Sequence, residues 1–291
     1  MDTHDGAPLH GVRAVTLAVN VPGPVAAARL RTLGATVVKI EPPAGDPLEA
    51  VSAAWYRELR AGQEVVQLNL KEDGDRRALD DLLGRADLLL TATRPAALGR
   101  LGLAWPLLHE RFPRLAQVAI VGHPAPHADA PGHDLTYQAS LGLLTPPELP
   151  RTLLADLAGA EQAVSAALAL LYARERGRGA GYAEVSLAGA ADVFADPLRH
   201  GLTTPGGVLG GALPAYNVYR TSEGWIAVGA LEPHFLARLQ RELGLARMHK
   251  DALAAVFRAE SAGYWEAWGA RRDLPLVALR ESNQSSVVSR Q

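Results

Sequence analysis

Asp156 is the first residue from which chemistry can be argued, because it stands before the longest helical pattern in the chain, 157–176. Free backbone amides and the helix dipole stabilise a carboxylate at a helix start, and Asp is a favoured N-cap residue. The residue type alone therefore favours a capping role over a reactive one. The neighbours at 155 and 158–160 are all Ala or Gly, which leaves room for a ligand to approach the helix end.

His133 is the second candidate, at the junction between a Pro-rich loop and a helix. An imidazole that titrates near neutral pH at such a junction can act as a general acid or base. With His123, His127 and Asp134 it could also form a metal site. The Pro-broken loop gives these residues no helical or hairpin register to converge four ligands, so we expect no metal.

Three cations lie at or just past the ends of expected strands: Lys39, Lys71 and Arg94. Ligands of open α/β sheets bind at these strand ends, although solvated cations at loop starts are an equally good explanation. The net charge of -2 gives no general field for nucleic acid or an anionic membrane, so an anionic ligand needs a local basic site. The absence of Cys excludes thiolate nucleophiles and fits a reducing cytoplasm.

Apolar runs and helical patterns alternate through the first two thirds of the chain, which predicts a parallel sheet flanked by helices. The first turn, 18–24, contains two prolines in place of a glycine-rich phosphate loop. A nicotinamide dinucleotide is therefore not favoured, although Glu41 ends the second strand. The strands are expected at 12–19, 34–41, 65–70, 87–91, 115–121 and 182–187, and the helices at 23–33, 74–85, 105–112, 157–176 and 188–194.

A Gly-, Thr- and Pro-rich segment, 200–213, predicts a linker between a large domain, 1–199, and a small α+β domain, 214–291. The small domain is expected to contain a hairpin, a helix opened by Glu232-Pro233, two further helices and a last strand at 274–279, followed by a polar tail. No uncharged apolar run reaches membrane-spanning length and the N-terminus lacks a signal pattern, so we expect a cytoplasmic protein without membrane contact.

These segments, in this order, resemble the family III CoA-transferases (CaiB/BaiF superfamily), and within them they are most similar to the α-methylacyl-CoA racemases. The resemblance implies a large Rossmann-like α/β domain, a smaller α+β domain, and a homodimer of interlocked chains. In relatives the C-terminal segment returns to the large domain. The matching pieces are 9–13, 23–24, 33–47, 68–71, 94–95, 100–103, 132–134, 156–159, 174–179, 214–219 and 228–233.

Asp156 matches the active-site carboxylate of this family, which is a nucleophile in the transferases and an acid or base in the racemases. His133 and Glu232 match residues typical of the racemase branch. Inverting a carbon beside a thioester needs one group to remove a proton and another to return it, a role that suits His133 and Asp156. We assign Glu232 to orienting His133, and the helix amides near Asp156 to stabilising the enolate oxygen.

Coenzyme A is expected as part of an acyl-CoA thioester substrate, with no permanently bound cofactor. The resemblance assigns its binding to Lys39, Leu68, Lys71, Arg94 and Arg100, whose cations suit phosphates. We expect a racemase or epimerase of a 2-methylacyl-CoA. A CoA-transferase with Asp156 as nucleophile is the alternative. A catalytically impaired member, suggested by the departure from the family pattern at 91–93, is a second alternative.

Overall fold

The computed structural model describes residues 6–280, and the chain divides into two compact units, one ending at Ala195 and one beginning at Asp196. The division falls just before position 199, where the sequence predicted the end of the large domain. The expected linker, 200–213, therefore belongs to the second unit, where it contains a short π-helix, Val208–Ala212. Each unit is described separately.

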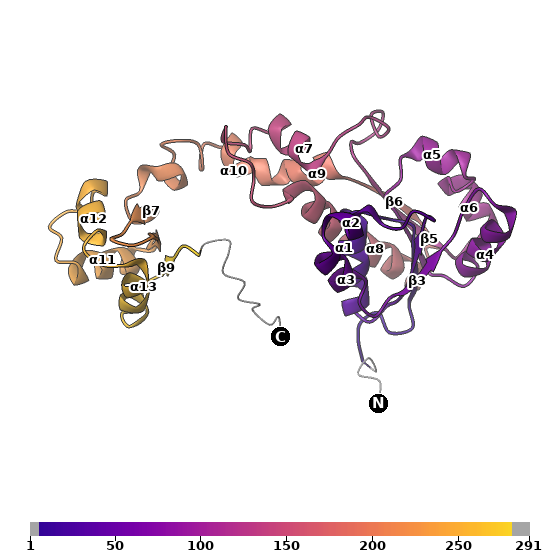
Figure 1. Ribbon diagram of the computed structural model, residues 1–291, viewed down its shortest axis with the longest axis horizontal. Coiled ribbons are helices and arrows are strands. Elements are labelled where there is room, and N and C mark those ends of the chain that lie inside the picture. The colour runs from indigo at the N-terminus through magenta and orange to yellow at the C-terminus, as the bar shows by residue number, and fades with distance from the viewer. Residues whose placement is uncertain (1–5, 281–291) are drawn as a thin grey trace. The chain divides into compact units, whose positions relative to one another are not determined.

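A six-stranded parallel sheet forms the centre of the first unit, in the order β3-β2-β1-β4-β5-β6. The strand order reverses between β1 and β4, which is where sheets of this kind bind their ligands. The predicted α/β fold with a parallel sheet is confirmed (Figure 1). The strands are β1 (Arg13–Thr16), β2 (Thr36–Glu41), β3 (Glu64–Gln67), β4 (Leu88–Thr91), β5 (Ala116–Val121) and β6 (Tyr182–Ser186).

Helices connect these strands, and four of them begin with Pro at a first-turn position, where the missing N–H costs nothing. The helices α2, α3 and α5 were not expected from the sequence. The described helices of this unit are α1 (Pro22–Thr32), α2 (Pro47–Val51), α3 (Ala53–Arg60), α4 (Asp73–Leu83), α5 (Pro95–Arg100), α6 (Trp105–Arg111), α7 (Asp134–Ser140), α8 (Leu154–Glu175) and α9 (Leu187–Asp192).

Both faces of the sheet are buried. Along β4, Leu88 and Leu90 contribute to one hydrophobic core with residues of α1 and α8, while Leu89 contributes to another with residues of α4 and α6. This alternation explains why the strand is an uninterrupted apolar run, as is typical of parallel sheets covered by helices on both sides.

The helix α8 lies against β5, β6, α1 and α9 at the centre of the first unit. Its buried face is made of small residues, among them Ala155, Gly159, Ala163 and Ala167, so that it approaches its neighbours closely. Among the described residues it alone has the length and hydropathy of a membrane span, and 44% of its most apolar window is buried inside the protein. The helix contains charged residues, among them Asp156 and Glu161, so the prediction made for uncharged apolar runs is not contradicted by it.

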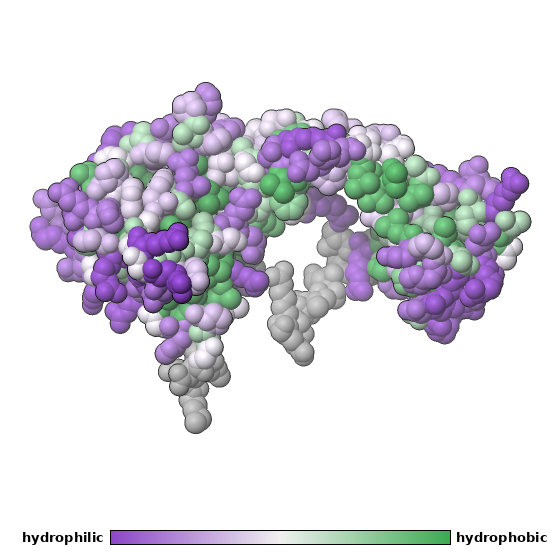
Figure 2. Space-filling view, turned by 180° about the vertical axis from the view of Figure 1, so that it is seen from behind, coloured by the Kyte–Doolittle hydropathy of each residue, from purple (hydrophilic) through white to green (hydrophobic). Residues whose placement is uncertain are grey.

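The second unit contains a three-stranded antiparallel sheet and, among its described residues, four α-helices; the predicted hairpin and the three predicted helices are confirmed. One face of the sheet packs Tyr219 and Ile226 against the helices, while Tyr216 and Val218 of the other face are exposed. Figure 2 shows such apolar residues at the surface of both units. The tail at 282–291 lies outside the described residues. The elements are β7 (Tyr216–Arg220), β8 (Trp225–Gly229), β9 (Leu276–Ala278), α10 (Asp196–Arg199), α11 (Pro233–Glu242), α12 (Lys250–Phe257) and α13 (Ala262–Ala270).

Candidate active site

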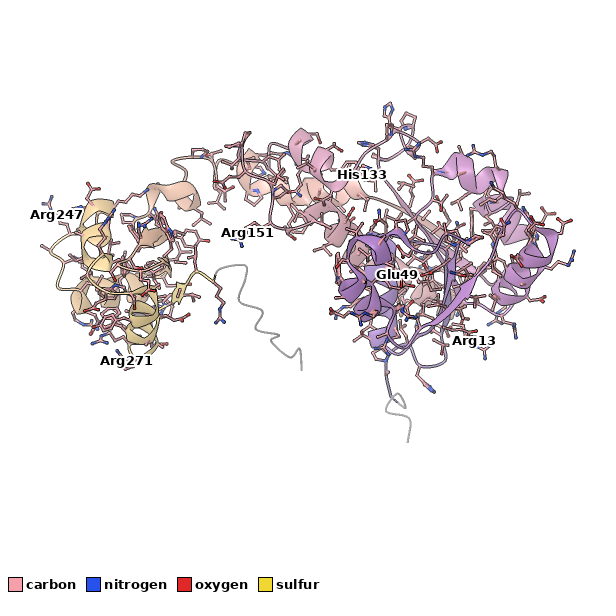
Figure 3. The ribbon with its side chains drawn as sticks, viewed as in Figure 1. Arg13, Glu49, His133, Arg151, Arg247 and Arg271 are labelled. Carbon is pink, nitrogen blue, oxygen red and sulfur yellow. The ribbon has the colours of Figure 1, made fainter. Side chains whose placement is uncertain are left out.

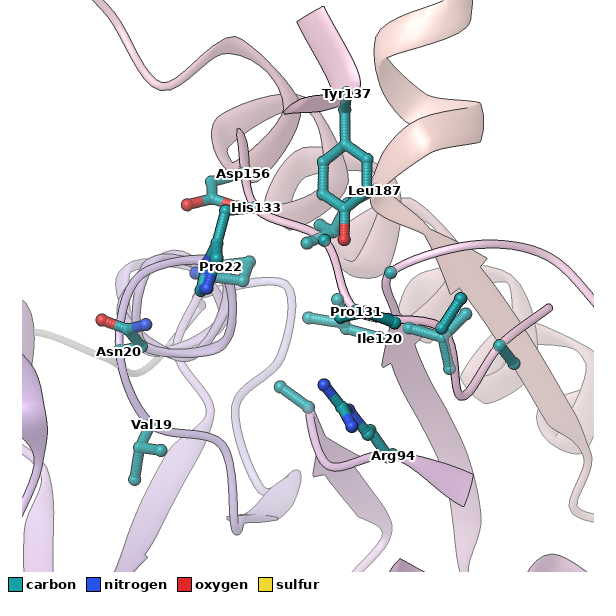
Figure 4. A pocket seen from close by; sticks show the side chains of 16 residues that line it. Val19, Asn20, Pro22, Arg94, Ile120, Pro131, His133, Tyr137, Asp156 and Leu187 are labelled. Atoms are coloured by element: carbon teal, nitrogen blue, oxygen red, sulfur yellow. The ribbon is translucent and has the colours of Figure 1, made fainter. Parts of the chain in front are cut away.

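A cavity of about 260 Å³ lies at the carboxyl ends of β1, β4 and β5, at the point where the strand order reverses. Residues from the loops after these strands and from the starts of α7 and α8 line it. Figure 4 shows His133 and Asp156 on the same side of this cavity, near Asn20 and Pro22. We call it the first cavity; its polar and charged side chains are Asn20, Arg94, His133, Tyr137 and Asp156.

His133 is the N-cap residue of α7, which confirms the predicted junction of loop and helix (Figure 3). Its backbone N–H donates to Thr136 Oγ1 at 3.0 Å, and that hydroxyl donates to the His133 carbonyl at 2.8 Å. These two bonds fix the backbone at the helix start while the imidazole lines the first cavity. The side chain is therefore free to exchange protons with a ligand there.

Asp156 is the third residue of α8, because the helix begins at Leu154, three positions before the predicted start at 157. The N-cap is Leu153, whose side chain makes no capping bond, so the predicted capping role of Asp156 is wrong. The pKa of Asp156 is raised from 3.8 to about 6, mainly by burial and in part by the nearby Asp134 carboxylate, while His133 acts to lower it. The expectation that the helix end would favour the ionised form is wrong as well, since desolvation dominates.

The side chain of Asp134, and not that of Asp156, caps the start of α8. Its Oδ1 accepts from the backbone amides of Ala155 at 2.7 Å and Asp156 at 3.1 Å, and its Oδ2 accepts from Gln138 Nε2 at 2.6 Å. The carboxylate is 5% exposed. Because these two amides of α8 already have an acceptor, they cannot stabilise an enolate, and that expectation is corrected. Sequence reasoning considered Asp134 only as a metal ligand and as part of a motif.

Tyr137 is a further residue that sequence reasoning missed. It is 2% exposed, and its phenol oxygen points into the first cavity (Figure 4). A Cβ atom at either Gly122 or Gly132 would lie 2.5 Å from an atom of this phenol, so glycine at both positions gives it room. Burial, and then the Asp156 charge, raise the pKa of Tyr137, while Arg94 lowers it, so the hydroxyl remains a hydrogen-bond donor at neutral pH.

A second cavity of about 550 Å³ lies at the carboxyl ends of β1 to β4. Leu68 and Lys71, both of which were predicted to bind CoA, line this cavity. Val19 lines both cavities, and Thr93 of the second precedes Arg94 of the first, so the two cavities adjoin.

Lys39 lies inside β2 and is 1% exposed. Its ammonium donates to Glu41 Oε1 at 2.6 Å and to Asp46 Oδ2 at 2.5 Å, and Glu41 Oε1 also accepts from the Tyr56 hydroxyl at 2.8 Å. Asp46 Oδ1 accepts from the backbone amide of Asn20 at 2.8 Å. Two carboxylates neutralise Lys39, and it lines neither cavity, so the structure gives no support to its predicted contact with CoA phosphates.

The sequence matches the model of CoA-transferase family III over residues 9–273. The chain belongs to this family. It is 27% identical to the probable fatty acyl-CoA transferase Rv3272 of Mycobacterium tuberculosis, over 89% of this chain and 74% of the relative. The crystal structure of Rv3272 has a TM-score of 0.83 at 25% identity and covers 96% of this chain and 86% of that one.

Relatives of both catalytic kinds occur. The α-methylacyl-CoA racemase of Mus musculus is 32% identical over 81% of this chain and 65% of the relative. The cinnamoyl-CoA:phenyllactate CoA-transferase of Clostridium sporogenes is 36% identical over 43% of this chain and 34% of the relative. The chain thus spans between 34% and 74% of the length of the three curated relatives named here.

Two further residues predicted for the family III site, besides Lys39, line neither cavity. Arg100 is the exposed last residue of α5 and lines neither of them. Glu232 is the N-cap residue of α11, exposed in the second unit, so its predicted effect on His133 in the first unit stays a prediction. Within residues 6–280, no group of three or more His, Asp or Glu side chains is gathered in a way that would hold a metal ion.

Proposed function

We propose that this chain is an acyl-CoA racemase or epimerase that inverts the α-carbon of a 2-methylacyl-CoA. The observation that carries this proposal is that His133 and Asp156 line one cavity and interact electrostatically, with the pKa of Asp156 raised to about 6. Groups that exchange protons with a substrate work best when their pKa values lie near the operating pH. The racemase relative, which is 32% identical over 81% of this chain, adds support.

In the proposed reaction one of the two side chains removes the proton on the α-carbon, and the resulting electron pair forms an enolate on the thioester oxygen. The other side chain returns a proton to the opposite face of that carbon. The two residues exchange roles when the other enantiomer binds. Tyr137 supports the enolate in this scheme, because a buried phenol that stays protonated can donate a hydrogen bond to the developing negative oxygen.

Coenzyme A enters as part of the substrate, and we assign its nucleotide end to the second cavity. Lys71 is exposed at the wall of this cavity and Arg94 stands where the two cavities adjoin, so both cations can pair with phosphate oxygens. The thioester then reaches the first cavity past Val19. A homodimer, a cytoplasmic location and the part of Arg100 and Glu232 remain proposals that rest on the family resemblance.

The decisive experiment follows proton exchange at the α-carbon. Purified protein is incubated with a single enantiomer of a 2-methylacyl-CoA in heavy water, and mass spectrometry and chiral chromatography follow deuterium uptake and inversion. We expect both, with losses of about 100-fold or more in His133→Gln and Asp156→Asn. Glu161→Gln is the matched control, since Glu161 is an exposed carboxylate on the same helix. No exchange with any acyl chain of a panel would overturn the proposal.

A CoA-transferase is the second candidate, favoured by the same cavity because Asp156 is mostly ionised above about pH 6. Its carboxylate would attack the thioester carbonyl, form a mixed anhydride and release the CoA thiolate. The thiolate would then attack the aspartyl carbonyl, which gives an aspartyl-CoA thioester and the free acid. Intact-protein mass spectrometry with acyl-CoA and a second carboxylic acid tests this route, because the adduct on Asp156 must be absent from Asp156→Asn.

Calorimetry with CoA tests the remaining alternative, a member that has lost catalysis. The departure at 91–93 includes Thr91, whose buried hydroxyl has no hydrogen-bond partner among the described residues. CoA binding without proton exchange or adduct formation would favour this alternative. Exchange that disappears in His133→Gln and Asp156→Asn would exclude it.

A further inference from the structure

Asp134 connects the two helices that carry the proposed acid and base. It is the first residue of α7, directly after His133, and its carboxylate reaches the backbone of α8. Two consecutive residues thus have linked positions: His133 lines the first cavity, and Asp134 binds the backbone of Asp156, which lines the same cavity. The established family membership does not assign this role to Asp134.

The carboxylate of Asp134 is held on both oxygens. Oδ1 accepts from the amides of Ala155 and Asp156, at 2.7 and 3.1 Å, and Oδ2 accepts from Gln138 one turn further along α7, at 2.6 Å. The side chain is 5% exposed, and charge-assisted bonds of this kind in a buried position are strong. They fix the first turn of α8 relative to the start of α7.

We propose that Asp134 is a positioning residue, whose buried carboxylate holds Asp156 beside His133 at the first cavity by binding the first-turn amides of α8. The proposal rests on the proposed function only in that Asp156 is the reacting carboxyl group. A displacement of about 1 Å at a reacting group can slow an enzyme about 100-fold, so an anchor at this place matters for rate.

The charge of Asp134 acts on Asp156 as well. A negative group beside a second carboxyl opposes its ionisation, in the same direction as burial, and His133 opposes both. The other charged or titratable groups facing this site are Tyr137 of α7 and Arg94 at the start of α5. Removing only the charge of Asp134 should therefore make Asp156 ionise at lower pH, which a purely structural role would not cause.

The test titrates the Asp156 carboxyl group by carbon-13 NMR in the protein without substrate, with Asp156→Asn used to assign the signal. Asp134→Asn keeps the size of the side chain and the Oδ1 acceptor but removes the charge. We expect its Asp156 midpoint to move from about 6 toward 3.8 without reaching it, because burial remains. The control is Asp129→Asn, an exposed acid of the preceding loop, which should leave the midpoint unchanged.

Asp134→Ala removes the acceptor as well, and it separates positioning from charge. We expect a loss of about 10- to 100-fold in the turnover number for α-proton exchange, a nearly unchanged KM, and a partial recovery in Asp134→Asn. An unchanged Asp156 midpoint in Asp134→Asn, or equal rates in the wild type and Asp134→Ala, would overturn the proposal. The titration needs no turnover, so its result stands whether or not the racemase activity is found.

Discussion

Lys39 lies within β2 and Lys71 lies just after the end of the neighbouring strand β3. Their surroundings give the two side chains different roles. Lys39 is enclosed with Glu41 and Asp46, whereas Lys71 is exposed at the wall of the second cavity. A buried cation between two carboxylates stabilises the fold mainly because its removal leaves both negative charges buried without compensation. An exposed cation beside a cavity contributes little to stability and can bind a ligand.

We therefore expect Lys39→Met to lower the free energy of unfolding by about 3–5 kcal/mol. The matched variant Lys71→Met should change it by less than about 0.5 kcal/mol and weaken CoA binding instead. Urea unfolding measures the first quantity and calorimetry the second. If Lys39→Met kept the stability of the wild type and lost only CoA affinity, the buried ion group would not have the role described.

The raised pKa of Asp156 also predicts how stability depends on pH. Because the folded pKa of about 6 lies above the ordinary value of 3.8, folding favours the protonated carboxyl group. This contribution is fully present below about pH 4 and is lost as the pH rises through 6. Asp156→Asn cannot ionise, so we expect it to be more stable than the wild type at pH 7.5 by on the order of 1–2 kcal/mol, after discounting for partial exposure.

Urea unfolding of Asp156→Asn and wild type at pH 4 and pH 7.5 checks this expectation. The two proteins should differ much less at pH 4, since the carboxyl group is then protonated in the folded chain and about half protonated in the unfolded chain. Glu161→Gln, on the exposed side of the same helix, should show no such pH-dependent difference. A difference at pH 4 as large as the one at pH 7.5 would contradict the pKa assignment.

At the scale of the elements, the turn between β1 and α1 depends on a close approach. A Cβ atom at Gly23 would overlap the side chain of Ala18, and Asn20 in the same turn has a φ of 76°, in the left-handed region. Ala18 cannot move away easily, because it is 1% exposed and lies beside the sheet. The turn carries Asn20 into the first cavity, so its geometry also shapes the site.

We expect Gly23→Ala to lower the free energy of unfolding by about 1–3 kcal/mol and to reduce proton exchange at the same time. Gly74→Ala is the matched control: Gly74 lies in α4 with no atom within 4 Å of an added Cβ, and Ala there should stabilise the helix by about 0.5–1 kcal/mol. Denaturant unfolding of both variants provides the comparison. A Gly23→Ala protein as stable as the wild type would show that the turn can relax.

Local signals in the sequence predicted the elements well, and distant contacts account for what they missed. Pro233 predicted the start of α11, and the apolar run 88–90 predicted β4, in each case from neighbouring residues alone. The start of α8 depends instead on Asp134, which is distant in sequence from Ala155. In the same way, the role of Lys39 became visible only when the fold brought Asp46 to it. The sequence paired His133 with Asp156, and both line the first cavity, but it predicted neither Tyr137 nor the forces that set the pKa of Asp156.

At the scale of the molecule, each unit has a hydrophobic core of its own, one set around the parallel sheet and one around the small antiparallel sheet. Compact units with separate cores commonly fold independently. Both cavities lie in the first unit, whereas Glu232 lies in the second. Cutting the chain at the division therefore tests whether Glu232 takes part in the proposed reaction.

We expect a fragment of residues 1–195 to fold, to titrate Asp156 near pH 6 and to bind CoA. If Glu232 contributes to the reaction as proposed, this fragment should exchange α-protons at a rate reduced by about 100-fold or more. Circular dichroism, NMR and the exchange assay measure these properties. Full exchange activity in the fragment would remove Glu232 from the reaction, and an unfolded fragment would show that its core needs the second unit.

The backbone N–H of Asn20 donates to the Asp46 carboxylate, and this bond limits the kinds of nucleotide that can bind at the turn after β1. In sheets with this strand order, the turn after β1 is the place where the diphosphate of a redox dinucleotide meets backbone amides. Here a carboxylate of the protein is already bonded to such an amide, and its charge repels a second anion. The carboxylate of Asp46 thus stands where a phosphate oxygen would accept this backbone N–H, which disfavours a dinucleotide diphosphate at the turn.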